Sequence, residues 1–271
     1  MVTNEELVKI SKEIRADALK ATTEAGSGHP GGSLSATDIL VTLYWGVLRH
    51  DPRNPGWPDR DRFILSKGHA APALYAVLAK RGYFPQEELR HLREYESMLQ
   101  GHPDATRTPG VEVSSGSLGN GLSIASGIAS ALKLDGKGSR VYCLLGDGEC
   151  DEGLVWEAAM FAAHKKLDNL TAIVDRNGLQ IDGPTEKVLS LEPIADKWRA
   201  FNWNVICVSG HDHAKLFSAF EEAKCITGKP TVIIADTVKG KGVSFMEGVV
   251  GFHGKACTPA ELETACRELE G

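Results

Sequence analysis

Cysteine is scarce in this sequence, and the few cysteines form no recognisable pairs. Six occur in 271 residues, none in a CxxC pattern and none at zinc-ligand spacing from a histidine. A disulfide framework and a zinc site are therefore disfavoured, and we expect reduced thiols in an intracellular, cytoplasmic protein. Residues 1–6 also lack the basic and then apolar pattern of a signal peptide.

Basic blocks and strongly apolar runs are missing as well. With 30 Lys and Arg against 36 Asp and Glu, the net charge is −6, and no basic cluster favours nucleic acid as a partner. The uncharged run at 113–132 is long enough to span a bilayer but is rich in serine and glycine. We expect no membrane association, and interpret this run as a glycine-rich loop that leads into a helix of small residues.

The sequence does contain an alternation of apolar and amphipathic segments, with 42% hydrophobic residues to form a core. Continuous apolar runs predict buried strands at 63–65, 141–145, 170–175, 204–209 and 231–236. Apolar residues at helical spacing and sequence breakers predict helices at 4–24, 36–48, 72–81, 154–166, 215–225 and 258–271. This order predicts an α/β fold, a parallel sheet with helices on both faces.

Polar loops follow two successive predicted strands. Gly146-Asp147-Gly148 ends the strand at 141–145, and Asn177 follows the strand at 170–175, 30 residues after Asp147. In parallel α/β sheets, ligands bind beyond the carboxyl ends of the strands. A carboxylate and an amide offer oxygen ligands for Mg²⁺, with Ca²⁺ or Mn²⁺ as alternatives, and leave positions for diphosphate oxygens. A plain turn would explain the Asp and Gly residues but not the asparagine loop.

The pair Asp147 and Asn177 resembles the thiamine diphosphate signature, and the wider pattern resembles the transketolase family. The motifs that occur in that family's order are Ser27-Gly-His-Pro-Gly31, Ser66-Lys-Gly-His-Ala70, Gly101-His-Pro-Asp104, Gly116-Ser-Leu-Gly119, Gly146-Asp-Gly-Glu-Cys-Asp-Glu-Gly153, Ile181-Asp-Gly183 and Phe252-His-Gly254. The resemblance covers nearly the whole chain. It implies the thiamine diphosphate-binding fold, with residues 1–271 as a single diphosphate-binding domain and with the family's pyrimidine and C-terminal domains absent.

The resemblance also implies which residues hold the cofactor. Asp147, Asn177 and the backbone carbonyl of Leu179 would bind the metal ion. The implied cofactor-binding residues are His69, Gly116, Ser117, Leu118, Asp147, Gly148, Glu152, Asn177 and His253. Family members often have proline where Ser117 stands, which leaves the rigidity of that turn in question.

Substrate-channel and interface residues follow from the same resemblance. His29, His102 and His253 are the implied catalytic residues, which would bind sugar hydroxyls and move protons. Imidazole suits this task because its ordinary pKa lies near neutrality. Glu152 and Glu157 match acidic residues that lie at the family's dimer interface, whereas by themselves they would be ordinary charges in a first helical turn.

The length of the chain implies a partner. In the family, the pyrimidine domain supplies the glutamate that activates the cofactor, and we find no second α/β half here to carry it. We therefore expect a separate C-terminal transketolase subunit with the pyrimidine domain, in an α2β2 assembly. The expected reaction is transfer of a two-carbon ketol unit between sugar phosphates such as xylulose 5-phosphate and ribose 5-phosphate.

Three alternatives remain open at this point. One is a subunit of another thiamine diphosphate enzyme, of the deoxyxylulose-phosphate synthase or 2-oxo acid dehydrogenase type. Another is a non-catalytic subunit that keeps the cofactor half of a site. A dinucleotide-binding oxidoreductase is disfavoured, because no GxGxxG follows a predicted strand.

Overall fold

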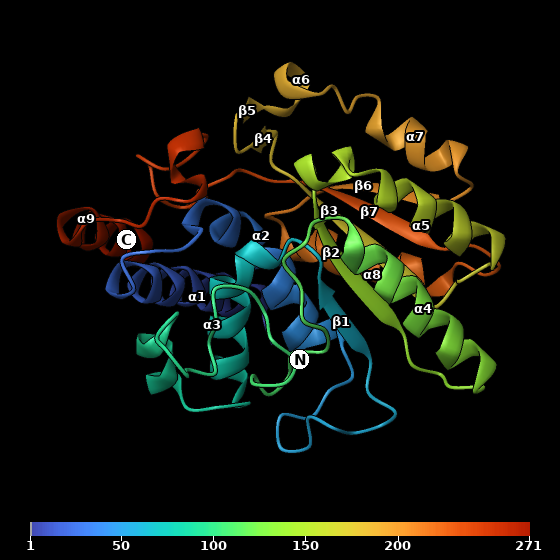
Figure 1. Cartoon of the computed structure of the whole chain (residues 1–271), viewed down its shortest axis with the longest axis horizontal. Coiled ribbons are helices and arrows are strands. Elements are labelled where there is room, and N and C mark those ends of the chain that lie inside the picture. Colours follow the sequence, from blue (N-terminus) through green and yellow to red (C-terminus); the bar gives the residue numbers. More distant parts are fainter. Residues whose placement is uncertain (1) are drawn as a thin grey trace.

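The computed structural model describes residues 2–271, and a parallel sheet lies at its centre (Figure 1). Its five strands are ordered β1-β2-β3-β7-β6. They are β1 (Arg62–Leu65), β2 (Val141–Gly146), β3 (Leu170–Arg176), β6 (Asn204–Ser209) and β7 (Thr231–Asp236). The predicted α/β class is confirmed, and each strand lies within one residue of its predicted bounds.

Both faces of this sheet are covered by helices, because successive residues of a strand point to opposite sides. Tyr142 and Leu144 of β2 belong to the core on one face, and Cys143 and Leu145 to the core on the other. The helices on the first face are α1 (Asn4–Glu24), α2 (Pro30–Thr42), α3 (Ala71–Arg81) and α8 (His213–Cys225). Those on the second are α4 (Asn120–Leu134), α5 (Gly153–His164) and α7 (Ile194–Ala200).

Helix α2 is the main departure from the predicted elements. The sequence predicts a helix at 36–48, but α2 begins at Pro30 and gives way at Leu43–Val47 to a π-helical turn. Proline is tolerated at the start of a helix because its missing N–H needs no partner there. Gly31 permits a close contact, since a Cβ at this position would lie 2.9 Å from the backbone oxygen of Phe252. Tight packing therefore outweighs the low helix propensity of glycine.

The remaining elements are short or lie at the chain's end. A hairpin of β4 (Leu179–Gln180) and β5 (Gly183–Pro184) precedes α6 (Thr185–Val188), and α9 (Pro259–Glu270) packs on α1 (Figure 1). Strands of two residues are too short to show a period, so the sequence does not predict this hairpin. Within residues 2–271, no helix combines the length and the apolarity needed to cross a bilayer.

Candidate active site

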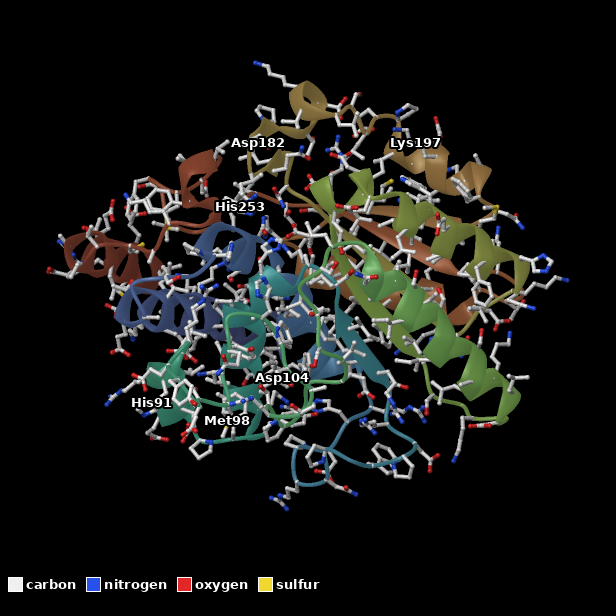
Figure 2. All side chains as sticks on the ribbon, in the orientation of Figure 1. His91, Met98, Asp104, Asp182, Lys197 and His253 are labelled. Carbon is white, nitrogen blue, oxygen red and sulfur yellow. The ribbon has the colours of Figure 1, made fainter. Side chains whose placement is uncertain are left out.

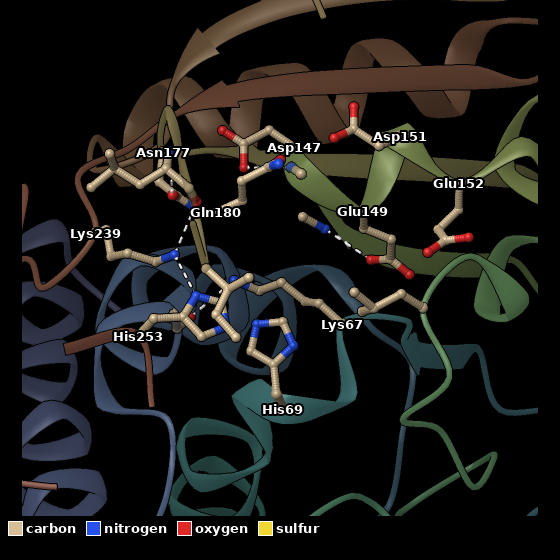
Figure 3. Close-up of a pocket in the computed structure, with 16 residues that line it drawn as sticks. Lys67, His69, Asp147, Glu149, Asp151, Glu152, Asn177, Gln180, Lys239 and His253 are labelled. Atoms are coloured by element: carbon tan, nitrogen blue, oxygen red, sulfur yellow. Dashed lines mark hydrogen bonds between the residues drawn. The ribbon is translucent and has the colours of Figure 1, made fainter. Parts of the chain in front are cut away.

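A cavity of about 300 Å³ opens at the carboxyl edge of the sheet (Figure 3). It is lined by Gly32, Lys67, His69, Leu118, Gly146, Asp147, Gly148, Glu149, Asp151, Glu152, Asn177, Leu179, Gln180, Ile181, Lys239 and His253. Figure 2 shows His253 between the N-terminal helices and the hairpin that carries Asp182. The cavity lies where ligands of parallel α/β sheets bind.

Asp147 directly follows strand β2 and is almost fully enclosed. Its side chain accepts the backbone N–H of Gly148 at 2.9 Å and that of Gly178 at 2.5 Å. Burial, and after it the neighbouring carboxylate of Asp175, raises the pKa of Asp147 to about 6. At neutral pH the site thus holds a buried anion that a bound cation would stabilise.

Asn177 and Leu179 complete the predicted set of metal ligands. The Asn177 side-chain oxygen accepts the Leu179 N–H at 3.2 Å, and the Leu179 carbonyl accepts from Lys239 Nζ at 2.9 Å. A carbonyl oxygen has two lone pairs, so one remains for a cation. Within the described residues, no three His, Cys, Asp or Glu side chains gather as metal ligands. A metal ion here would therefore use Asp147, an amide and a backbone oxygen, a donor set that suits Mg²⁺.

Two lysine ammonium groups make the same cavity attractive to an anion. Lys67 is 1% exposed, forms an ion pair with Asp175 and donates to the Gly32 carbonyl at 2.9 Å. Burial, together with the positive charge of Lys67, lowers the pKa of Lys239 to about 8. Because like charges destabilise each other in a buried site, a diphosphate beside these lysines would relieve the repulsion.

Unsatisfied polar atoms support the same fit. Across residues 2–271, the buried side-chain atoms without a hydrogen-bond partner include His29 Nδ1 and Gln180 Oε1. Gln180 lines the cavity, and the ring of His29 lies 5.3 Å from that of His69 in its wall. Buried polar groups are normally paired, so these two atoms are available to a polar ligand. The residues present therefore fit a metal ion with a diphosphate.

Four histidine rings gather beside the cavity. The ring centre of His29 lies 5.3, 6.3 and 5.6 Å from those of His69, His102 and His253. Burial, then the charge of Arg93, lowers the pKa of His29 to about 4, and burial with Lys239 does the same for His253. Both values lie below the ordinary pKa of histidine, because the rings are enclosed and lie among cations. They are neutral at pH 7 and offer hydrogen bonds instead of charge.

This lowered pKa makes the stability of the chain depend on pH. The pKa of His29 is about 4 in the fold and 6.5 for an ordinary histidine, so the unfolded chain binds more protons between these values. The free energy of unfolding therefore falls as the pH drops from 6.5 towards 4. We expect His29→Asn to reduce this fall by about 1 kcal/mol between about pH 7 and pH 5 in urea titrations. An unchanged slope would contradict the neutral state of His29.

Glu149 joins two loops of the site and was not predicted. Its buried carboxylate accepts the Gly119 N–H at 2.9 Å, the Gly146 N–H at 3.0 Å and the Ser66 hydroxyl. Burial raises the pKa of Glu149, although these three hydrogen bonds act in the opposite direction. The side chain fixes the turn before α4 against the end of β2.

The other predicted residues occupy several places around the cavity. Leu118 and Glu152 line it, and both are exposed to solvent at its mouth. Gly116 packs against His102, since a Cβ there would lie 3.1 Å from the ring. Neither Gly116 nor the exposed Ser117 lines the cavity itself. The roles assigned to these residues remain predictions.

Three further site residues were given no role by the sequence interpretation: Lys67, Asp175 and Lys239. Each lies at or just after the carboxyl end of a strand, namely β1, β3 and β7. The rule that identified Asp147 and Asn177 could have found them, because ligands of parallel α/β sheets bind beyond the carboxyl ends of the strands.

Comparison with known proteins agrees with the resemblance that the sequence motifs indicate. The family described as "Transketolase, thiamine diphosphate binding domain" matches residues 6–270. The chain is 48% identical to the 6-deoxy-6-sulfo-D-fructose transketolase subunit SqwG of Clostridium sp., over 95% of this chain and 94% of that protein. It is 42% identical to an apulose-4-phosphate transketolase subunit of Phocaeicola vulgatus, over 96% and 92% of the two chains.

A solved structure has the same fold. Transketolase from Campylobacter jejuni matches with a TM-score of 0.92 and 35% sequence identity. The match covers 97% of this chain and 42% of that protein, so this chain spans about two fifths of its length.

Proposed function

Because the chain belongs to the family of transketolase thiamine diphosphate-binding domains, we propose that it is the N-terminal subunit of a two-subunit transketolase. Its reaction is transfer of a two-carbon ketol unit from a ketose phosphate to an aldose phosphate. The observation that carries this proposal is the cavity, where Asp147, Asn177 and two lysines face the same space as His69 and His253.

The residues at the sheet edge are proposed to hold the cofactor. Asp147, Asn177 and the Leu179 carbonyl would bind Mg²⁺, and Gly148 and His69 would contact the diphosphate. Thiamine diphosphate, when bound, supplies the carbanion that takes up and releases the two-carbon unit. The turn at 116–118 lies beside this cavity and would approach the aminopyrimidine ring.

The histidines are proposed to bind the sugar. His29, His102 and His253 have lowered pKa values because they are buried, so near pH 7 each ring has one donor and one acceptor nitrogen. Neutral rings can orient the hydroxyls of a ketose and pass a proton between two of them without carrying charge. His29, whose Nδ1 has no partner within the described residues, would bind most directly.

A second subunit is proposed to supply the pyrimidine domain in an α2β2 assembly. The two relatives named as subunits match this chain over more than nine tenths of their own length. Leu118 and Ile181 line the cavity and are exposed, and so are Ile124 of α4 and Met160 and Phe161 of α5. We propose that these apolar side chains contact the second subunit, and that Glu152 and Glu157 lie in the same contact.

Reconstitution tests the proposal. We expect ketol transfer when this chain, a C-terminal subunit, Mg²⁺ and thiamine diphosphate are combined, and none when either protein is assayed without the other. The assay uses ribose 5-phosphate as acceptor and xylulose 5-phosphate as donor. Since the two named relatives act on different sugars, 6-deoxy-6-sulfo-D-fructose and apulose 4-phosphate are assayed too. Turnover of pyruvate without ketol transfer would contradict the proposal.

A further inference from the structure

Outside the cavity, a buried ion pair joins the first two helices. The Asp38 carboxylate of α2 accepts hydrogen bonds from both terminal nitrogens of Arg15 of α1, at 2.6 and 3.2 Å. Burial alone would raise the pKa of Asp38, but the charge of Arg15 and the hydrogen bonds to His211 and Arg15 hold it well below its usual range. Asp38 is therefore a fixed anion at neutral pH.

His211, in the turn between β6 and α8, uses both of its ring nitrogens. Its Nδ1 lies 2.7 Å from Asp38 Oδ2, and its Nε2 accepts the backbone N–H of Val238 at 2.8 Å. A nitrogen that accepts a hydrogen bond carries no proton, so the proton is on Nδ1 and is donated to the carboxylate. The carboxylate thus fixes the orientation and the tautomer of a ring that holds a backbone amide.

That amide leads directly into the cavity. Lys239, the next residue, is 3% exposed, and its Nζ lies 2.9 Å from the Leu179 carbonyl and 3.0 Å from His253 Nδ1. Because Lys239 is enclosed and its Nζ is held by these two contacts, a shift of its backbone would strain them and move the ammonium relative to the cavity. Val238 therefore stands between the buried ion pair and a cation in the cavity wall.

The residues before and after Val238 and Lys239 are held by backbone hydrogen bonds of their own. The Thr237 N–H bonds the carbonyl of Arg176, and the Gly240 N–H bonds the carbonyl of Gly31. At Val238 the acceptor is a side chain, which a single substitution can alter without changing the sheet or α2.

We infer that His211 is a positioning residue, which fixes Lys239 through the Val238 amide for the anionic part of the ligand in the cavity. The inference rests on the proposed function in one respect, because it takes that ligand to be thiamine diphosphate. His211 itself touches neither the cavity nor its contents; it acts through Val238.

Two substitutions of His211 test the hydrogen bonds of its Nδ1 and Nε2 separately. His211→Asn keeps a donor near the Nδ1 position for Asp38 but does not reach Val238, whereas His211→Gln keeps an acceptor near the Nε2 position for the Val238 N–H. In the reconstituted complex, we expect Asn to weaken binding of thiamine diphosphate with Mg²⁺ by about 10- to 100-fold, and Gln to stay within about threefold of the wild type. Calorimetric titration measures both. Equal affinity of the Asn variant and the wild type would overturn the inference.

A third variant controls for loss of stability. His213 bonds Ser11 and Thr42 and has only a 3.6 Å contact with Asp38. His213→Asn therefore removes a buried contact while Asp38 keeps its bonds to Arg15 and His211, and Val238 is not touched. We expect a lower melting temperature with unchanged cofactor affinity. If affinity merely follows melting temperature across the three variants, the role of His211 is structural and the inference is wrong.

Hydrogen exchange on the full chain without cofactor gives an independent answer. The Val238 amide is expected to exchange faster in the Asn variant and at the wild-type rate in the Gln variant. In the wild-type complex, the cofactor is expected to slow exchange at 237–240, because coupling between two sites is reciprocal. If the cofactor leaves exchange at 237–240 unchanged in the wild-type complex, the inference is overturned, even if the Asn variant does not fold.

A different result would contradict the proposed function. If the wild-type complex does not bind thiamine diphosphate, the proposed function fails. The exchange rate of the Val238 amide in the variants without cofactor still decides the role of His211.

Discussion

Asp147→Ala is expected to lower ketol transfer by the reconstituted complex by about 10²- to 10³-fold, or about 3–4 kcal/mol. The reason is that Asp147 is the one carboxylate among the three proposed metal ligands, and both of its oxygens are fixed by backbone N–H groups. Initial rates at saturating donor, and calorimetric titration of Mg²⁺ with thiamine diphosphate, measure the loss. Most of it should appear as weaker cofactor binding.

A matched control removes a carboxylate elsewhere. Asp196 lies on α7 with its side chain 68% exposed, where it pairs with Arg199. We expect Asp196→Asn to retain wild-type rate and affinity, since exposed ion pairs contribute little. Circular dichroism confirms that both variants are folded. A folded Asp147→Ala complex with full activity would show that the metal assignment is wrong.

Asp175→Ala is expected to produce the largest loss of stability, about 3–5 kcal/mol. Asp175 is 0% exposed, and its carboxylate pairs with Lys67 and accepts hydroxyl hydrogen bonds from Ser35 and Thr237. Alanine would leave the Lys67 ammonium, itself 1% exposed, in the cavity wall without its counter-ion. Urea titration measures this loss of unfolding free energy, and calorimetry should show a melting temperature lower by about 10 °C.

Two controls identify the cause of that loss. Asp236 ends the neighbouring strand β7 with its side chain 63% exposed, and we expect Asp236→Ala to change stability by less than about 0.5 kcal/mol. The double variant Lys67→Met with Asp175→Leu removes both charges and should recover at least about half of the loss. If Asp175→Ala stays within about 1 kcal/mol of the wild type, the buried pair does not stabilise the fold.

The fold could be predicted from the sequence because a strand that is buried on both faces of a sheet is apolar at every position. Strands such as 141–145 are apolar throughout, and the structure places their alternate residues in two different cores. The site followed because strand ends meet at one edge of a parallel sheet, which brought Asp147 and Asn177 to the same cavity.

What the sequence could not show depends on contacts between distant segments. The start of α2 at Pro30 depends on close packing against the backbone near Phe252, which no local pattern records. The low pKa of His29 arises from burial and from Arg93, which is 64 residues away in the chain. The same holds for Glu149, which accepts hydrogen bonds from the distant residues Ser66 and Gly119 as well as from the nearby Gly146.

We propose that this chain binds a metal ion and a diphosphate at the carboxyl edge of its sheet. Anomalous diffraction from crystals of the two-subunit complex with Mn²⁺ and thiamine diphosphate tests it most directly. The predicted result is one Mn²⁺ peak about 2.0–2.3 Å from a carboxylate oxygen of Asp147, the side-chain oxygen of Asn177 and the carbonyl oxygen of Leu179, with diphosphate oxygens on its open side. A peak away from these three oxygens, or a bound cofactor whose diphosphate lies outside this cavity, would contradict the claim.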